Sequence, residues 1–452
     1  MNVCVVGGAG YVGLVTGVGL AQIGHRVVGV DIDDERVSAL NAGRSPILED
    51  GIDLLLERNL TNGRIRFTTD FDEAVTQCEF VFVAVGTPSQ SDGQADLSQV
   101  IQVAESLQNH LAAYKIVVLK STVPVGTVEL VRDILGEGKE EGRDFDIVSN
   151  PEFLREGTGV RDFFEPDRIV IGTSSASALK ATRELYAPLI DGDNTVDHAP
   201  IPVIETDVAS AQMIKYASNT FLATRISFIN EVAGLCERVG ADVREVSRGM
   251  GYDPRIGHAY LQAGLGFGGP CLDKDLRALI KIAETSGFEP GLLRSVLDRN
   301  ELQIDDVVRK VKFMIGHLLY HRTIAVFGLA FKAGTNDLRN SMAVKVVTQL
   351  RGEGATVKAH DPVDFSEAEQ AGIHSCYVAD PYEAVRGADA LMILTDWPEF
   401  SALDYGRIRD LMASPAIVDA RNMLDATEMA ALGFSYNGIG RGVDPLSHAG
   451  RP

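Results

Sequence analysis

A glycine-rich stretch that ends beside a cysteine carries the clearest chemistry in this sequence. Residues 266–275 read Gly-Phe-Gly-Gly-Pro-Cys-Leu-Asp-Lys-Asp, and apolar residues at helical spacing follow Cys271. This pattern predicts that Cys271 lies in the first turn of a helix that Pro270 begins. The positive end of the helix dipole and the charge of Lys274 would then favour the nucleophilic thiolate, with Asp275 on the same helix face. The alternative is an inert cysteine buried in a turn.

Two pairs of polar residues could assist a nucleophile, one as carboxylates at a ligand-binding edge and one as hydrogen-bond donors to an oxyanion. The run Asn150–Gly157 follows a strand pattern, so Glu152 and Glu156 are expected at the carboxyl edge of a sheet, where ligands bind in α/β proteins. Lys215 and Asn219, at positions i and i+4, share one face of a long helical pattern and could both donate to one oxyanion. Either pair could instead be structural, as a charge at a helix N-terminus or a hydrogen bond on a helix face.

A glycine fingerprint near the N-terminus predicts a dinucleotide site. The run Gly8-Ala9-Gly10-Tyr11-Val12-Gly13 follows an apolar strand pattern and opens a helical one. The first glycine makes the tight turn, the second admits the pyrophosphate, and the third lets helix and strand pack closely. Asp31 ends the next strand pattern, where a carboxylate binds both ribose hydroxyls and repels a 2′-phosphate, so NAD is favoured over NADP. Arg36 either covers the adenosine or is a solvated helix residue.

The elements that position these residues begin with a repeating strand–helix pattern. In the first 200 residues, short apolar runs alternate with helical patterns, as in a doubly wound parallel sheet. The predicted buried strands are 3–6, 27–30, 80–85, 116–119, 147–148 and 169–171. A helix of about 30 residues from Asp207 to Gly234, capped by Thr206 or Asp207, would span about 45 Å. Such a helix would join two domains and offer a surface for dimer packing.

A second strand–turn–helix pattern begins near residue 320. Strands are predicted at 323–328, 356–361, 390–394 and 416–418, with a helix at 341–352. This copy lacks the three glycines, so we expect no second dinucleotide there. Lys332 and Arg339, in its loop, suit a diphosphate. The alternative is that they are surface cations that pair with Asp337.

The pattern as a whole predicts an α/β protein with two Rossmann-like, doubly wound domains joined by a long central helix and a helical middle region. The predicted domains are an NAD-binding domain at 1–200, a central helical and dimerisation domain with Cys271 at 201–318, and a second Rossmann-like domain at 319–440. A tail follows at 441–452, and the composition after about Gly438 is that of a disordered segment.

Composition narrows the choice of partners and compartment. The net charge of −21 argues against a nucleic-acid or anionic-membrane partner, although local Lys and Arg side chains can still bind a small anion. Five cysteines with no CxxC spacing indicate a reducing compartment rather than a disulfide scaffold, and we expect no bound metal. Because there is no signal-peptide pattern and no apolar run of about 18 residues, we expect a cytoplasmic protein.

Motifs in a shared order resemble the UDP-glucose/GDP-mannose dehydrogenase family over nearly the whole chain. Besides the glycine fingerprint, the matching segments are Val85–Pro88, Lys120–Gly126, Asn150–Gly157, Lys215–Ala223, Pro254–Gly257, the Cys271 loop and Gly328–Lys332. The resemblance implies an NAD-dependent four-electron oxidation of a sugar C6 alcohol to a carboxylate. The segments around Phe221–Phe228 and Arg255–Gly257 are most similar to the branch that uses UDP-glucose. GDP-mannose and UDP-N-acetylmannosamine are the alternatives within the family.

Cys271 and the polar residues described above can account chemically for that reaction. Cys271 can add to the aldehyde formed by a first hydride transfer, which gives a thiohemiacetal that donates a second hydride, and water then hydrolyses the thioester. By the resemblance, Lys215 and Asn219 stabilise the oxyanions, and Lys215 is also the base of the first step. The residues that position or deprotonate water are Glu152, Asp275 and Thr122.

The resemblance also implies two larger sets of binding residues. Those that approach NAD, besides the fingerprint and Asp31, are Thr87, Thr122, Glu156, Lys274 and Arg339. Those that line the nucleotide-sugar site are Glu152, Phe153, Leu154, Arg155, Glu156, Lys215, Asn219, Tyr260, Leu261, Gln262, Ala263, Gly264, Gly268 and Lys332. Arg255 reaches this site from a neighbouring subunit of a homodimer or higher oligomer. Arg421 reaches it from the C-terminal domain, which binds the UDP-sugar.

The chain departs from the family pattern beside the nucleophile. Pro270 stands where family members usually carry serine, which removes an N–H and a hydroxyl, and Asp273 stands where proline is frequent and adds negative charge.

Two alternative functions do not use thiol chemistry. One is a two-electron β-hydroxyacid-type dehydrogenase, which needs no thiol, and the other is a catalytically silent nucleotide-sugar or redox sensor.

Overall fold

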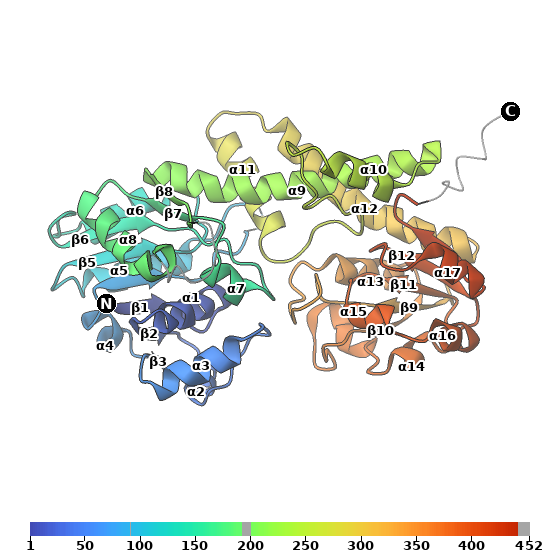
Figure 1. Cartoon of the computed structure of the whole chain (residues 1–452), viewed down its shortest axis with the longest axis horizontal. Helices are drawn as coiled ribbons and strands as arrows, with labels where there is room; N and C mark the ends of the chain where they lie inside the picture. Colours follow the sequence, from blue (N-terminus) through green and yellow to red (C-terminus); the bar gives the residue numbers. More distant parts are fainter. Residues whose placement is uncertain (91, 192–199, 442–452) are drawn as a thin grey trace. The chain divides into compact units, whose positions relative to one another are not determined.

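The computed structural model describes residues 1–90, 92–191 and 200–441. The chain forms two compact units, which are described separately: residues 1–218 with 277–287, and residues 219–276 with the chain from Phe288 onwards. Figure 1 labels most of the helices and strands of both. The division into three domains and a tail remains a prediction.

The first unit is built on an eight-stranded sheet. Its strands are β1 (Asn2–Val6), β2 (Arg26–Val30), β3 (Ile65–Thr68), β4 (Phe80–Val83), β5 (Lys115–Leu119), β6 (Phe145–Ser149), β7 (Ile169–Gly172) and β8 (Val203–Thr206). They lie in the order β3-β2-β1-β4-β5-β6-β7-β8, and the first six pair in parallel. This is the strand order of a Rossmann fold, and the six predicted strands are confirmed.

The far edge of this sheet differs from the prediction. β7 runs antiparallel to β6 through the pair Ser149–Gly172, so the expectation of a fully parallel sheet is wrong there. The sequence pattern also misses β3 and β8. β3 alternates buried with half-buried residues, and β8 lies at the partly exposed edge. Neither strand has the continuous apolar run of a strand that is buried on both faces.

Helices cover both faces of the sheet. Val3 and Val5 of β1 pack in one cluster with residues of α1 (Tyr11–Gln22), whereas Cys4 and Val6 pack in another with residues of α5 (Ser98–Gln108) and α6 (Thr127–Leu135). The other helices of the unit are α2 (Asp34–Asn41), α3 (Ile52–Thr61), α4 (Phe71–Thr76), α7 (Gly159–Phe164) and α8 (Ala176–Ile190). This doubly wound arrangement brings the carboxyl ends of the parallel strands to one edge.

The long helix α9 (Val208–Val239) begins in the first unit and ends in the second. Asp207 is its N-cap, because its side chain accepts a hydrogen bond from the Ser210 N–H at 2.8 Å. With 32 residues, the helix continues past Gly234, so the predicted long helix is confirmed and is longer than expected. Over the ranges that the structure describes, no helix combines the length and the apolar character needed to cross a membrane.

The second unit contains a five-stranded parallel sheet. Its strands are β9 (Thr323–Phe327), β10 (Thr356–His360), β11 (Ala390–Ile393), β12 (Ala416–Asp419) and β13 (Ser435–Gly438). They lie in the order β10-β9-β11-β12-β13, the other common doubly wound order, so the second Rossmann-like sheet is confirmed. The sequence pattern misses β13, a polar and partly exposed edge strand.

The chain stays ordered beyond the point where the sequence predicts a disordered tail. Ile439 is buried, and the Gly440 N–H donates to a Glu237 carboxylate oxygen at 2.7 Å. The prediction is therefore wrong for residues 439–441, and residues 442–452 lie outside the described residues.

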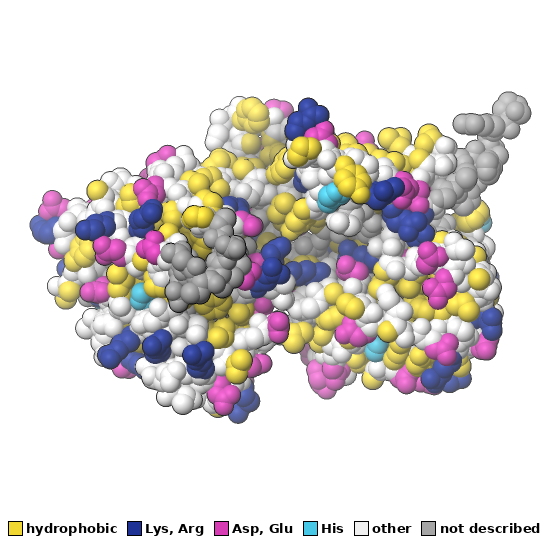
Figure 2. All heavy atoms as spheres, in the orientation of Figure 1, with side chains coloured by type: hydrophobic (Ala, Val, Ile, Leu, Met, Phe, Trp, Pro, Cys, Tyr) yellow, Lys and Arg dark blue, Asp and Glu magenta, His cyan; other side chains and the backbone are white. Residues whose placement is uncertain are grey.

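The second unit contains further helices after α9. They are α10 (Val243–Gly251), α11 (Leu272–Thr285, which ends in the first unit), α12 (Gly291–Ile315), α13 (Met342–Gly352), α14 (Pro381–Val385), α15 (Pro398–Ser401), α16 (Tyr405–Leu411) and α17 (Ala426–Ala431), with a 3₁₀ helix at Gln370–Ser375. Of these, α10 precedes the loop that leads to Cys271 and α11 follows it. α12 contacts β11 and β12, and α13 contacts β10. On the face shown in Figure 2, Lys and Arg side chains are intermixed with Asp and Glu side chains.

Candidate active site

The glycine fingerprint forms the turn between β1 and α1, as predicted. The positive backbone angle lies at Gly7 (φ 81°), so Gly7 makes the tight turn and the assignment of that role to Gly8 is wrong. A Cβ atom on Gly13 would lie 2.1 Å from the Gly7 carbonyl oxygen, so only glycine fits there. Gly10 is the N-cap of α1 and no side chain caps this helix, which suits its first N–H groups, from Tyr11 and Val12 on, to a pyrophosphate.

Asp31 lies beside this turn, just after β2, where the sequence predicts a contact with the ribose. Its carboxylate accepts a hydrogen bond from the Ala9 N–H at 3.0 Å, and the residue is partly exposed. The corresponding acid of the second sheet, Asp361, is fully buried. It accepts from the Leu329 N–H at 2.7 Å and from the Trp397 indole N–H at 3.2 Å, and burial raises its pKa. The first acid thus stays partly exposed beside the fingerprint turn, whereas the second is buried and holds its own turn.

Other residues predicted to approach NAD occupy the carboxyl edge of the first sheet or its helices. The Thr87 hydroxyl, after β4, donates to the Thr122 carbonyl, after β5, at 2.8 Å. Glu156 is half-buried in the turn before α7. Arg36 forms an ion pair with Asp33 at 3.2 Å and more than half of its side chain is exposed. That is the geometry of a solvated helix residue.

Glu152 and Lys215 form a buried ion pair in the first unit. Lys215 Nζ lies 2.9 Å from Glu152 Oε1, and the Leu154 N–H donates to the other carboxylate oxygen at 2.6 Å. Both charged side chains are buried. Because an unpaired buried charge is strongly destabilising, each group fixes the position of the other.

Two further cations lie near this pair, and the sequence analysis assigns neither of them to the site. The Arg168 guanidinium lies 3.6 Å from the centre of the Phe153 ring, and Lys215 Nζ lies 5.2 Å from the same centre. The buried Lys120 donates to the Asn150 side-chain oxygen at 3.0 Å. Burial lowers the pKa of Lys120 to about 8. Single cations beside strands produce no periodic signal, so the sequence pattern does not predict that Lys120 and Arg168 lie near the Glu152–Lys215 pair.

In the second unit, Asn219 is paired with Asp275. The Asn219 side-chain amide donates to Asp275 Oδ2 at 2.6 Å, and Lys274 Nζ lies 2.6 Å from Oδ1. The Asp275 side chain is almost fully buried. Asn219 lies one turn after Lys215 on α9, so successive turns of this helix each present a donor that is bound to an acid.

The exposed Cys271 is the N-cap of α11 rather than part of its first turn. The helix begins at Leu272, and the Asp275 N–H donates to the Cys271 carbonyl at 2.9 Å. Gly269 has a φ of 82° and turns the chain just before the helix, so Pro270 stays outside it. The predicted position is therefore wrong by about one residue, but the thiol still lies at the positive end of the helix dipole.

Buried amide side chains hold the segment that leads to Cys271. Asn230 Oδ1 accepts from the Gly264 N–H at 2.8 Å, and Gln303 donates to the Gly264 carbonyl at 2.7 Å. Asn300 accepts from the Phe267 N–H at 2.8 Å and donates to its carbonyl at 2.9 Å. Sequence analysis misses these three residues. Their only signal is an amide among the apolar residues of a helical segment.

The segment 260–264 has one unusual backbone angle and mixed exposure. Tyr260 has a φ of 60°, which is uncommon for a residue with a Cβ atom. Leu261, Ala263 and Gly264 are buried and Gln262 is exposed. Side chains therefore reach the surface of this segment at Gln262 and at the half-buried Tyr260, and the rest can offer backbone atoms.

The cations predicted for the nucleotide sugar lie at the carboxyl ends of the second sheet. Arg421 follows β12 and donates to the Leu394 carbonyl at 2.7 Å, and burial lowers its pKa. Lys332 lies in the loop after β9, with its amine 5.6 Å from the centre of the Phe331 ring. β9 and β11 flank the point where the strand order reverses, which is where doubly wound sheets bind ligands.

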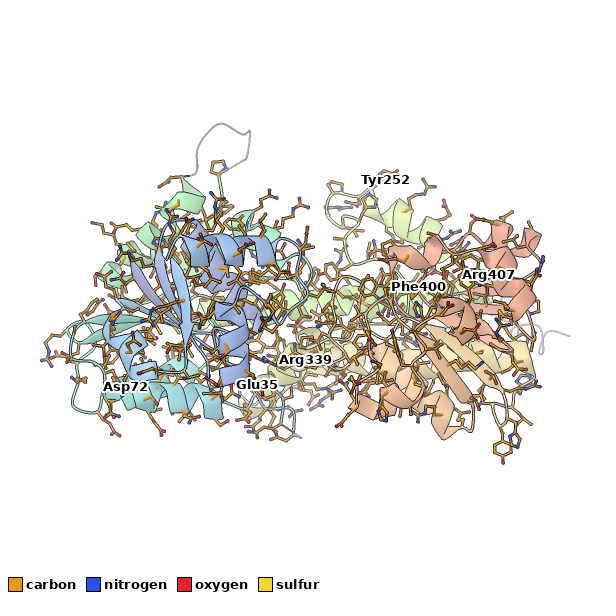
Figure 3. All side chains as sticks on the ribbon, turned by 90° about the horizontal axis from the view of Figure 1, so that it is seen from below. Glu35, Asp72, Tyr252, Arg339, Phe400 and Arg407 are labelled. Carbon is orange, nitrogen blue, oxygen red and sulfur yellow. The ribbon has the colours of Figure 1, made fainter. Side chains whose placement is uncertain are left out.

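The remaining predicted residues lie on loops. Arg339, labelled in Figure 3, pairs with Asp337 at 2.5 Å, which is the surface contact weighed as the alternative to a diphosphate. Arg255 is 87% exposed and pairs with Asp253 at 2.6 Å. At Gly268 a Cβ atom would lie 2.6 Å from the Asn340 carbonyl oxygen, so this turn packs closely on the loop after β9.

Comparisons with known proteins decide the family. Sequence models of the UDP-glucose/GDP-mannose dehydrogenase family match residues 1–190 (NAD binding domain), 209–302 (central domain) and 325–426 (UDP binding domain). The UDP-glucose 6-dehydrogenase TuaD of Bacillus subtilis (strain 168) is 44% identical over 435 residues, 96% of this chain and 92% of that protein. This chain belongs to the UDP-glucose/GDP-mannose dehydrogenase family. It is therefore an NAD-dependent oxidoreductase with a UDP-binding domain, and the predicted family, enzyme class and cofactor are confirmed.

Two further relatives extend over the same length. The UDP-glucose 6-dehydrogenase of Rhizobium meliloti (strain 1021) is 45% identical over 437 residues, 96% of this chain and 98% of that protein. A solved UDP-glucose dehydrogenase from the hyperthermophilic archaeon Pyrobaculum islandicum has a TM-score of 0.87 and 38% identity over 97% of each chain. In the described ranges of this family member, no cluster of three or more His, Cys, Asp or Glu side chains is arranged to hold a metal ion.

Lys120→Met is expected to change how the stability of this family member depends on pH. Burial lowers the pKa of Lys120 from 10.5 to about 8, so the unfolded chain binds more protons than the folded one between these values. The free energy of unfolding of the wild type should therefore rise relative to that of the variant by about 2 kcal/mol between pH 7 and pH 9.5. Denaturant unfolding across that range measures the difference. The exposed Lys180→Met is the control, and an equal pH slope in all three proteins would contradict the buried, depressed lysine.

Proposed function

We propose that this family member oxidises UDP-glucose at C6 to UDP-glucuronate with two equivalents of NAD. The observation that carries the proposal is the exposed Cys271 at the N-terminus of α11, one turn before a buried Asp275 that Asn219 binds. A thiol at a helix N-terminus is suited to nucleophilic attack, and a bound carboxylate nearby is suited to orient water. The relatives named UDP-glucose 6-dehydrogenase, at 44% and 45% identity, support the choice of sugar.

In this reaction Cys271 carries the sugar carbon between two oxidations. NAD, when bound, accepts a hydride in each of them. The Cys271 thiolate adds to the C6 aldehyde, and the new C–S bond gives a thiohemiacetal that becomes a thioester when its C–H is lost as hydride. Water then breaks the C–S bond, which releases the carboxylate and restores the thiol. Each UDP-glucose consumes one water and yields UDP-glucuronate, two NADH and three protons.

The residues of the two pairs take distinct roles in this scheme. Lys215 and Asn219 donate hydrogen bonds to the C6 oxygen whenever it carries negative charge. In its neutral form, Lys215 also takes the hydroxyl proton in the first step, and the ammonium that results is held by the Glu152 carboxylate at 2.9 Å. Glu152 and Asp275, with Thr122, orient and deprotonate the hydrolytic water.

The roles of residues that bind NAD and UDP are assigned from the family's NAD binding and UDP binding domains in the same way. The N–H groups of α1 hold the pyrophosphate of NAD, and Asp31 binds the adenosine ribose. Lys332 and Arg421 bind the UDP moiety of the sugar nucleotide as cations at the carboxyl ends of the second sheet. The other predicted contacts of NAD and the sugar, and the reach of Arg255 into a neighbouring subunit, remain predictions.

The cysteines support a cytoplasmic location, which we include in the proposal. Cys4, Cys78, Cys236 and Cys376 are buried free thiols. Burial raises the pKa of each, so they behave as small apolar residues rather than as nucleophiles or disulfide partners. Such thiols are typical of proteins from reducing compartments.

The yield of NADH per sugar tests the proposed function. The wild type should form two NADH for each UDP-glucose consumed, and far less with GDP-mannose or UDP-N-acetylmannosamine. Cys271→Ser should lower turnover by at least about 10³-fold, because the hydroxyl is a poor substitute for the thiolate. Cys236→Ala, at a buried cysteine, is the control. A single NADH per UDP-glucose, with aldehyde accumulating in the wild type, would rule out the four-electron reaction.

We further propose that two copies of this chain pair along α9. Phe221, Phe228 and Leu235 recur every seven residues on this helix and are 61%, 50% and 56% exposed. Large apolar side chains in a row at this spacing form a stripe along one face, and such exposed stripes are usually covered by a partner. The long-helix dimer surface expected from the sequence thus has a definite candidate, the stripe of these three residues.

Phe228→Glu should weaken this dimer, because it buries a carboxylate against the apolar stripe of the partner. Sedimentation equilibrium should show the wild type as a dimer or larger species and the variant shifted toward monomer by at least about tenfold in the dissociation constant. Leu54→Glu, which adds the same charge at an exposed leucine of α3, is the control. A wild type that is monomeric at micromolar concentration, or equal dissociation constants for all three proteins, would contradict the proposal.

A further inference from the structure

A buried glutamate outside the proposed catalytic groups joins two parts of the first unit. Glu49 lies in the segment between α2 and α3 and is 6% exposed. Its Oε2 accepts hydrogen bonds from the Tyr11 hydroxyl at 2.6 Å and from the Gly157 N–H at 2.7 Å. Its Oε1 accepts from the Val160 N–H at 3.3 Å. Three donors thus converge on one carboxylate, which is the arrangement that a buried carboxylate requires.

The three donors come from two segments, one predicted to bind NAD and one predicted to bind the nucleotide sugar, whose relative position matters for the reaction. Tyr11 is the first residue of α1 and lies inside the glycine fingerprint. Gly157 and Val160 belong to the turn that follows Glu156 and opens α7. The Glu49 carboxylate therefore ties the start of the NAD-binding helix to the end of the segment that carries Glu152 and Glu156.

The Tyr11 ring is packed so that its hydroxyl reaches this carboxylate. A Cβ atom on Gly159 would lie 2.2 Å from the Tyr11 oxygen, so the first residue of α7 must be glycine for the ring to fit. The same oxygen lies 2.9 Å from the Arg155 carbonyl. Burial, and then the adjacent Glu49, raise the pKa of Tyr11, which keeps the hydroxyl protonated and able to donate.

A second contact fixes the same two helices farther along. A Cβ atom on Gly19 of α1 would lie 2.4 Å from the Phe163 ring of α7. The turn itself is closed by Asp162, whose carboxylate accepts from the Arg155 N–H at 2.8 Å. With α1 and α7 held here, the Glu49 bonds determine where the turn 155–160 sits relative to the fingerprint.

We propose that Glu49 is a positioning residue that fixes the glycine fingerprint (residues 8–13) relative to residues 152–157. Its loss therefore weakens the binding of both NAD and the nucleotide sugar. The proposal rests on the proposed binding of NAD by the fingerprint and on the predicted contacts of residues 152–156 with the nucleotide sugar. Glu49 itself touches neither ligand in this account. It acts through Tyr11 and through the backbone at Gly157 and Val160.

Glu49→Gln, Tyr11→Phe and the double variant test this role. The glutamine amide must face one of the three donors, and the phenylalanine removes only the hydroxyl. We expect KM for NAD and KM for UDP-glucose each to rise about tenfold in either single variant, with a smaller change in kcat. The double variant should be little worse than Glu49→Gln, because both changes break the same contact. Glu57→Gln, an exposed glutamate of α3, is the control.

Binding measured without turnover separates this proposal from the proposed function. NADH affinity by nicotinamide fluorescence and UDP-glucose affinity by calorimetry without NAD should both fall in the variants, independently of how many electrons the enzyme removes. Unchanged affinities, loss of only one of the two, or additive effects of the two substitutions would each overturn the role of Glu49. A lower melting temperature with unaltered KM values in the folded fraction would overturn it in favour of a purely structural role. If Glu49→Gln does not fold, Tyr11→Phe alone must show the double loss.

Discussion

Two donors on α9, Lys215 and Asn219, are each bound to a buried acid, and these two pairs are the constraint on which the proposed site depends. Lys215 binds Glu152 at 2.9 Å and Asn219 binds Asp275 at 2.6 Å, one helical turn apart. Removing one partner of a buried ion pair costs about 3–5 kcal/mol, so the native fold keeps the Glu152 carboxylate beside the lysine. The groups that stabilise the fold here are the same groups that the proposed oxidation uses. Stability and function therefore constrain the same four residues.

Both sheets are doubly wound, although their strand orders differ, and they belong to domains for different ligands. In the first, Gly13 lets α1 approach the turn after β1, and Asp31 stays partly exposed beside it. In the second, Asp361 is buried among backbone N–H groups and an indole, and its loop offers Lys332 instead. The matched domains are the NAD binding and UDP binding domains of the family. The chemistry at the carboxyl ends of the strands, rather than the fold, separates the two.

The sequence predicts the elements with strong periodicity and the residues in compact motifs. Buried strands such as β4, the long α9 and the fingerprint stand out because apolar runs and glycine spacing are local signals. β13 and the direction of β7 depend on neighbouring strands, so no local pattern reports them. Two of the three donors to Glu49, Gly157 and Val160, lie more than 100 positions away in the chain, and Asn300 also acts through distant backbone. Such contacts follow from tertiary packing and leave no trace in spacing.

Trapping the sugar on Cys271 tests the central claim most directly. In Glu152→Gln the proposed hydrolysis is blocked, so UDP-glucose and NAD should give a burst of NADH followed by arrest. Rapid acid quenching and mass spectrometry of the peptide with Cys271 should then show a uronyl thioester that hydroxylamine removes. The adduct should be absent when either NAD or UDP-glucose is omitted. An NADH burst with an unmodified Cys271 would contradict the covalent account.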